Sequence, residues 1–309
     1  MAAMIVKRPQ PHLFSYPRSY MGAKIHQLPA ELTIRVLEIA LLVAKTSTIS
    51  TISKTLHEFI NDILYRVVVL DSEETIRHFH RTAKANNVDV LSRVKKLVVV
   101  WQPEKESLKV NGMIRDIITA CSYIHHLEIS TLNPNAIPDM SKHHNLADLT
   151  TQFLELGAFE GRLSGLHPKL THLRLAEPPE AGRVLQPGKV LEEFGNPSHL
   201  THLQLSRRTH ANEDNDLAFV EDIRTILQLN TYSSLKMLVV SIFNGESWRP
   251  EPITESHIWG LLDAVSKIDD RVVLVEGQKG EWGEGWKGYS PCDGMKIKCW
   301  SEFSPKTYY

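Results

Sequence analysis

The sequence is poor in the features that mark several large classes of protein. It has three cysteines among 309 residues, which cannot all pair and suit a reducing compartment. The longest purely apolar run, residues 39–44, is far shorter than the ~20 residues that cross a bilayer. A net charge of −1 gives no field that attracts nucleic acid or anionic lipid. We therefore expect a cytoplasmic or nuclear chain that binds neither nucleic acid nor membrane.

The sequence also lacks a convincing catalytic or metal-binding motif. Gly283, Gly285 and Gly288 have the spacing of a dinucleotide fingerprint, yet the segment that follows, Tyr289-Ser290-Pro291, cannot open a helix. The fifteen histidines form no His-Glu-x-x-His phrase, and no two close cysteine pairs are present for zinc. We expect no enzymatic activity, no metal and no cofactor. An enzyme built on a histidine-rich sheet face is a remote alternative.

A repeated phrase is what the sequence does contain. Leu-Thr-His-Leu-x-Leu occurs at residues 170–175 and 200–205, and looser copies of its apolar pattern begin at residues 94, 124, 146 and 235. Successive starts lie 22 to 35 residues apart (146 − 124 and 235 − 200), the range of leucine-rich repeats. The alternating phrases predict strands, and several are followed by a helical pattern. The expected fold is therefore α/β, an irregular leucine-rich-repeat-like solenoid with parallel strands on its concave face and helices outside.

Some boundaries of these elements can be predicted from local signals. Asn111-Gly112 indicates a turn that precedes a helix over residues 114–121. Thr254 is the predicted N-cap of a later helix that extends to Ile268. The apolar run from Arg271 to Val275 predicts a last buried strand.

Residues 28–70 break the repeat and predict two short helices. The first has an apolar face made by Val36, Ile39, Ala40 and Val43, and the second covers residues 49–63. So few residues make a poor core by themselves, and we expect part of their apolar surface to meet a partner or the first repeat.

Three phrases in this segment resemble a known family. Leu28-Pro29-x-Glu31-Leu32, then Ile52-Ser53-Lys54, then residues 63–70, which contain Leu64-Tyr65, are similar to the F-box-like motif of fungal proteins. The resemblance covers about forty-five residues. It implies a substrate-recognition subunit of a cullin-RING ubiquitin ligase, which binds a Skp-type adaptor through its N-terminal helices and a protein substrate through its repeats. The adaptor-facing residues would be Leu28, Pro29, Leu32, Leu37 and Leu41.

The chain departs from the family pattern at two positions. Leu56 stands where many F-boxes have Trp, and Asp62 stands where a Pro often precedes the Leu-Tyr phrase. The alternative function is a stand-alone repeat scaffold for protein–protein interaction without any ligase. The exposure of Leu28, Pro29 and Leu32 in the folded chain discriminates between the two.

The predicted organisation has three parts: a disordered leader over residues 1–24, the F-box-like segment over residues 25–70, and the solenoid over residues 71–309 with a Gly/Trp-rich C-terminal cap. On the concave face, neighbouring strands would align two rows of polar side chains. The first row is His126, Asp148, His172 and His202, and the second is Glu128, Thr150, Arg174 and Gln204.

We expect a protein partner to contact six of these residues: His126, Glu128, His172, Arg174, His202 and Gln204. Protonation of the histidines below about pH 6.5 would then alter binding. The alternative is a solvated sheet surface without a partner.

Overall fold

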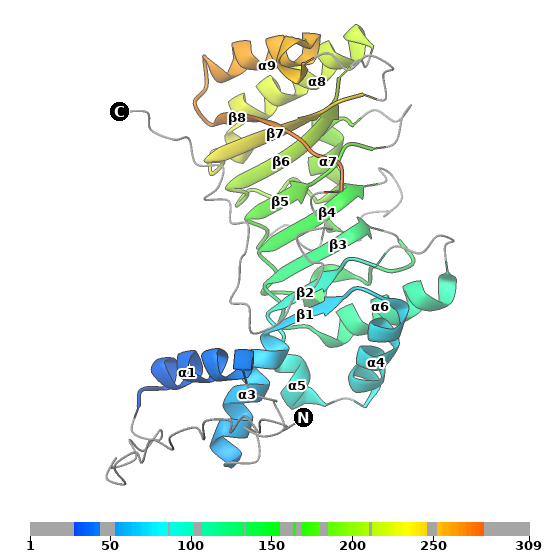
Figure 1. The fold of residues 1–309 in the computed structure, drawn as a ribbon. Coiled ribbons are helices and arrows are strands. Elements are labelled where there is room, and N and C mark those ends of the chain that lie inside the picture. Colours follow the sequence, from blue (N-terminus) through cyan, green and yellow to red (C-terminus); the bar gives the residue numbers. More distant parts are fainter. Residues whose placement is uncertain are drawn as a thin grey trace, which may run out of the picture.

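The sheet dominates the computed structural model, which describes residues 28–43, 53–85, 87–101, 107–132, 134–154, 163–164, 169–179, 185–209, 212–245 and 252–280. Within these residues, eight parallel strands form one sheet in the order of the chain (Figure 1). They are β1 (Val67–Leu70), β2 (Lys96–Val99), β3 (His126–Leu132), β4 (Asp148–Leu154), β5 (His172–Leu175), β6 (His202–Arg208), β7 (Met237–Phe243) and β8 (Val272–Glu276). Each strand therefore pairs with the strand that precedes it, as the repeated phrase predicts.

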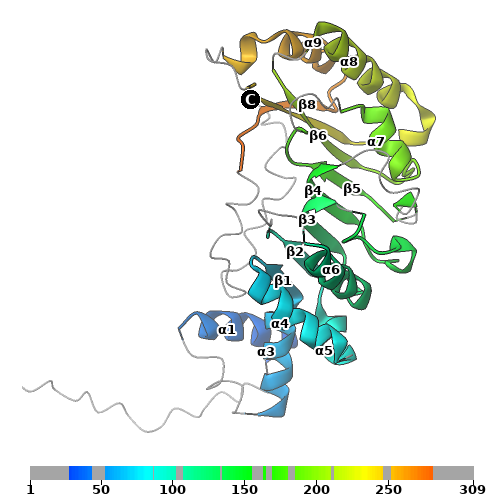
Figure 2. The same ribbon diagram turned by 90° about the vertical axis from the view of Figure 1, so that its right-hand side faces the viewer.

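Helices connect these strands. They are α1 (Ala30–Val43), α3 (Lys54–Arg66), α4 (Glu73–Lys84), α5 (Val88–Arg93), α6 (Leu108–Ala120), α7 (Pro187–Glu193), α8 (Glu213–Gln228) and α9 (His257–Ser266). In the part of the chain that the structure describes there are also three short 3-10 turns, η2 (Met140–Lys142), η4 (Asn230–Tyr232) and η5 (Ile253–Glu255). Figure 2 shows α6, α7 and α8 on the same side of the sheet. The predicted α/β class with a parallel sheet is confirmed.

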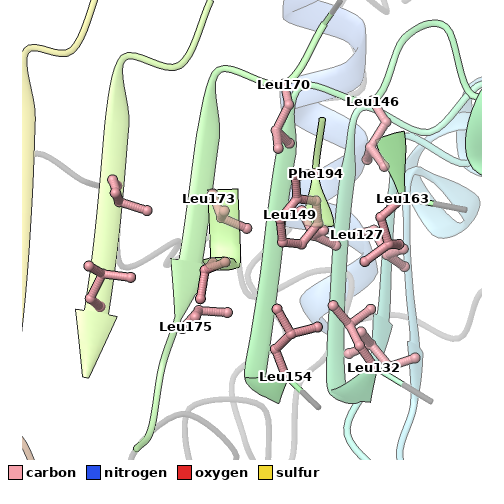
Figure 3. Packing of buried hydrophobic residues seen from close by; sticks show 14 of the residues in the cluster. Leu127, Leu132, Leu146, Leu149, Leu154, Leu163, Leu170, Leu173, Leu175 and Phe194 are labelled. Carbon is pink, nitrogen blue, oxygen red and sulfur yellow. The ribbon is translucent and has the colours of Figure 1, made fainter. Parts of the chain in front are cut away.

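The central leucine of each repeated phrase fixes the register. Leu127 pairs with Leu149, which pairs with Leu173, which pairs with Leu203. All four are buried, and Figure 3 shows the first three on neighbouring strands with Phe194 beside them. Because side chains alternate between the two faces of a strand, this row of leucines leaves the residues on either side of it for the opposite face. That opposite face, which carries the two predicted polar rows, is called the polar face below.

Serine side chains cap several helices, and two predicted helix starts are wrong. The hydroxyl of Ser107 accepts the Val110 N–H, so α6 begins earlier than predicted and the Asn111-Gly112 pair lies inside it. The burial of the apolar face of α6 stabilises the helix more than the turn preference of Asn111-Gly112 disfavours it. The N-cap of α9 is Ser256 rather than Thr254, which lies in the preceding 3-10 turn. The last strand is one residue later than predicted.

The two N-terminal helices form a small core of their own. Its buried side chains are Leu37, Leu41, Leu56, Ile60 and Ile63, and they are separate from the continuous core beneath the sheet. The end of α3 runs directly into β1, which attaches this pair to the first strand. The predicted leader, the Gly/Trp-rich cap and the first residues of the predicted second helix lie outside the described residues.

None of the described helices combines the length and the apolar character that a bilayer crossing requires.

Candidate interaction surfaces

An exposed apolar stripe runs along α1. Leu28, Leu32, Val36 and Ile39 are 37%, 54%, 42% and 55% exposed. Leu32, Val36 and Ile39 are four and three residues apart, so they lie above one another on one helical face, and Leu28 lies two residues before the start of α1. We call these four residues the α1 stripe. Aliphatic side chains aligned in this way on an outer face are typical of a protein–protein contact.

The structure corrects part of the predicted adaptor-facing set. Leu28, Pro29 and Leu32 are exposed, as the prediction requires. Leu37 and Leu41 are buried against α3, because they lie on the opposite side of α1 and fill the small core. Val36 and Ile39, which the sequence pattern placed on the apolar face of this helix, are exposed. Two apolar stripes share this helix, and periodicity alone does not tell which of them faces inward.

Both departures from the family pattern have a structural role inside the chain. Leu56 is 3% exposed and packs within the small core, so it is not part of the exposed stripe. Asp62 accepts a hydrogen bond from Arg93 of α5, and the same guanidinium donates to the Glu58 carbonyl at 3.1 Å. These contacts fasten α3 to the first strand–helix unit. Neither departure removes a side chain from the α1 stripe.

The polar face has the predicted alignment. Along the first row, His126 pairs with Asp148, Asp148 with His172, and His172 with His202. Along the second row, the strands pair Glu128, Thr150, Arg174 and Gln204 in that order. The sheet therefore brings together all the polar residues that the sequence assigned to these rows.

A pair of stacked histidines lies at the centre of the first row. The rings of His172 and His202 are 4.4 Å apart and nearly parallel, with 7° between their planes. The hydroxyl of Thr171 donates to the Ala147 carbonyl at 3.0 Å and lies 2.9 Å from His172 Nδ1. A hydroxyl has one proton, so Nδ1 must donate to it, which assigns the proton of the neutral ring to Nδ1.

The second copy of the phrase repeats this arrangement. Thr201 donates to the Thr171 carbonyl at 3.0 Å and lies 2.8 Å from His202 Nδ1. The threonine of Leu-Thr-His-Leu therefore links neighbouring repeats and orients the histidine that follows it. The sequence analysis missed this role, although the repeated Thr-His pair was its signal.

Burial lowers the pKa of His172, and the charge of His126 adds to this effect while Asp148 opposes it. Burial also lowers the pKa of His202, followed by the influence of His172 and Lys236. At any given pH, both rings are therefore less protonated than an ordinary histidine. This corrects the expected pH range. Because both pKa values are lowered, the pair becomes protonated at a lower pH than an ordinary histidine does.

Other polar side chains of this face are engaged within the sheet. Lys96 of β2 forms an ion pair with Glu128, and the two side chains are 6% and 15% exposed. Gln204 is buried and donates from Nε2 to the Ser241 hydroxyl at 2.7 Å. Gln204 therefore has almost no exposed surface, unlike the half-buried residues of the predicted partner-binding set. His126, His172, Arg174 and His202 keep partial exposure.

The described residues contain no cluster of metal ligands, and their one cysteine, Cys121, is buried. Among them, no group of three or more His, Cys, Asp or Glu side chains could hold a metal ion. Burial raises the pKa of Cys121 to about 12, so its thiol is protonated and unreactive at neutral pH. The fingerprint-like Gly283, Gly285 and Gly288 lie outside the described residues.

Comparison of the chain with models of known protein families, and with curated protein sequences, gave no match.

Proposed function

We propose that this protein is the substrate-recognition subunit of a cullin-RING ubiquitin ligase, with no catalysis of its own. The α1 stripe binds the Skp-type adaptor, and the strand–helix units, interpreted as degenerate leucine-rich repeats in a curved solenoid, hold a protein substrate. The observation that supports this most is the exposure of Leu28, just before α1, and of Leu32 on α1, a helix whose other side is already packed. Such a ligase subunit would act in the cytoplasm or nucleus.

The internal contacts of the helical pair favour an adaptor role over a simple cap. A segment that only covered the end of the sheet would turn its largest apolar surface toward the first strand. Here the small core is complete without the α1 stripe, and α3 is fastened by Arg93 instead. Burying one such aliphatic side chain in a complex contributes ~1.5 to 3 kcal/mol. The four residues of the stripe therefore suffice for a specific contact.

A pull-down with the host's Skp-type adaptor tests this proposal. The wild-type protein should retain the adaptor, and a Leu28→Ala, Leu32→Ala double variant should lose at least about tenfold in affinity, because about 1.4 kcal/mol corresponds to a factor of ten. The matched control is Leu108→Ala, Leu217→Ala, which removes two leucines that are also exposed, on α6 and α8. Circular dichroism shows whether each variant is folded.

Three outcomes are informative. Loss of binding in the stripe variant alone supports the adaptor role. Equal binding by both double variants would contradict a contact through the α1 stripe. No binding by the wild type would leave the alternative, a stand-alone repeat scaffold that binds its partner without a ligase.

A further inference from the structure

Exposed lysines gather at the edge of the sheet where the strands begin, the blunt ends of the arrows in Figure 1. The backbone is aligned there from strand to strand. The Lys236 N–H donates to the Thr201 carbonyl, and the Thr201 N–H donates to the Thr171 carbonyl, both at 2.8 Å. Four exposed lysines lie in the segments that lead into β2, β4, β5 and β7. We call them the basic edge: Lys95, Lys142, Lys169 and Lys236.

No carboxylate of the described chain forms an ion pair with any lysine of the basic edge. Other lysines are paired, since Lys96 contacts Glu128 and Lys267 lies 2.6 Å from Asp263. Lys95 donates to a backbone carbonyl at 3.0 Å, which leaves its charge in place. The basic edge is therefore a row of exposed positive charge.

Two neighbouring side chains bear on the size of this charge. Partial burial lowers the pKa of His125, and the positive charges of Lys95 and His126 lower it further, as expected at a surface with excess positive charge. Glu192, near the end of α7, is exposed at the same edge and offsets part of the charge. One carboxylate against four ammonium groups leaves the edge positive.

The helices that end at this edge do not account for the lysines. A helix C-terminus favours basic residues in its last turn, because its free carbonyl groups carry partial negative charge. The helices α6, α7 and α8 end here, yet none of them has a basic residue in its last turn. Lys169 and Lys236 lie instead directly before the first leucine of a repeated phrase or directly after it.

The basic edge has the length of a short extended peptide. Lys95 precedes β2 and Lys236 precedes β7, which is five strands further along the sheet. At about 4.8 Å between neighbouring strands, the two backbone positions are about 24 Å apart. An extended chain advances about 3.3 Å per residue, so roughly seven residues follow the whole edge. Several side chains of one such segment can therefore face the lysines together.

We propose that the basic edge binds an extended acidic segment of a partner protein, whose Asp and Glu carboxylates face the four lysines. Charge complementarity of this kind directs association and sets the register of the bound segment. Single-stranded nucleic acid fits less well, because its binding sites add aromatic side chains on which bases stack. Among the described residues, Tyr123 is the one exposed Phe, Tyr or Trp. This surface is separate from the α1 stripe, so the inference goes beyond the proposed function.

Fluorescence anisotropy with a fluorescein-labelled octaglutamate peptide and the full chain tests the proposal. The wild type should bind at about 50 mM salt and bind severalfold more weakly at about 200 mM, because salt screens exposed charges. Lys169→Glu, Lys236→Glu should weaken binding at least about tenfold, since it replaces attraction by repulsion. The matched control is Lys54→Glu, Lys109→Glu, which makes the same change of net charge at exposed lysines of α3 and α6. It should bind nearly as the wild type does.

Weaker binding in the edge variant alone supports the proposal, with circular dichroism showing that both variants are folded. Equal loss in the two variants would overturn it, since that pattern reports net charge rather than the edge. Absence of binding by the wild type at about 50 mM salt would also overturn it. A thymidine oligonucleotide of equal charge is titrated in parallel, and tighter binding of the oligonucleotide would contradict the choice of an acidic polypeptide. None of these readouts involves the adaptor, so failure here is distinct from failure of the ligase proposal.

Discussion

The sheet and the N-terminal helical pair are stabilised in different ways. Beneath the sheet, one continuous core joins every repeat to its neighbours, from Leu70 at the end of β1 to Val272 at the start of β8. Among the described residues, the core of the helical pair has five buried apolar residues, and a second apolar stripe lies on the outside of the pair. A large core can tolerate the loss of one contact at its margin, whereas a small one depends on each residue. The comparison teaches that the sheet has its own continuous core, whereas α1 has apolar side chains that no core of the described chain buries.

The largest expected effect comes from breaking each core in turn. Leu203→Ala should lower the free energy of unfolding of the sheet by about 2–5 kcal/mol, because Leu203 is fully buried and its cavity cannot collapse. Leu37→Ala should instead release α1 alone, since Leu37 belongs to the small core and not to the core beneath the sheet. Chemical denaturation with hydrogen exchange by mass spectrometry measures both. A Leu37→Ala variant whose sheet unfolds at the wild-type denaturant concentration, with fast exchange in α1, supports the distinction; a lowered midpoint contradicts it.

A smaller effect on the sheet should follow from pH. The pKa values of His172 and His202 are lowered in the folded state, so the unfolded state binds protons more readily. The stability from this pair is therefore fully present above pH 6.5 and is lost as the pH falls from 6.5 toward the lowered pKa values. Replacing both by Gln should make the free energy of unfolding less dependent on pH in this range. His144→Gln is the control, since His144 is exposed.

Urea titrations between pH 7.5 and 5 measure this dependence. A double variant with the same slope as the wild type would show that the stacked pair is not its source. The rate of hydrogen exchange in α1 should be unaffected by replacing the two histidines, because they belong to the sheet.

The smallest effect sharpens the comparison by stabilising one region. Gly112 lies in α6, where a Cβ would meet nothing within 4 Å, so Gly112→Ala should add about 0.5–1 kcal/mol to the stability of the sheet. Gly195 is the matched contrast: its φ is +72 and a Cβ would approach Ser164 Cβ to 3.0 Å, so Gly195→Ala should destabilise. Thermal unfolding measures both signs. A stabilising Gly195→Ala would contradict the described turn.

The strands could be predicted from the sequence because their period of two is regular and their leucines repeat. That pattern placed Leu173 and Leu203 side by side, and the register followed with it. The α1 helix was harder because apolar residues occupy both of its faces, and Leu37 and Val36 are adjacent in the sequence but face opposite environments. The burial of Gln204 was beyond prediction, since its acceptor, Ser241, comes from a strand thirty-seven residues later. Local preference also failed at Gly112, where packing of α6 decides.

The measurement that tests the account most directly is a calorimetric titration of the Skp-type adaptor into the wild type and into a Val36→Ala, Ile39→Ala variant. These two residues are exposed on the α1 stripe and do not belong to the small core, so their replacement should leave that core intact. The account predicts an affinity at least about tenfold weaker in the variant, since each side chain contributes ~1.5 kcal/mol or more when buried. Unchanged affinity, with both proteins folded, would contradict the claim that the α1 stripe is the docking surface.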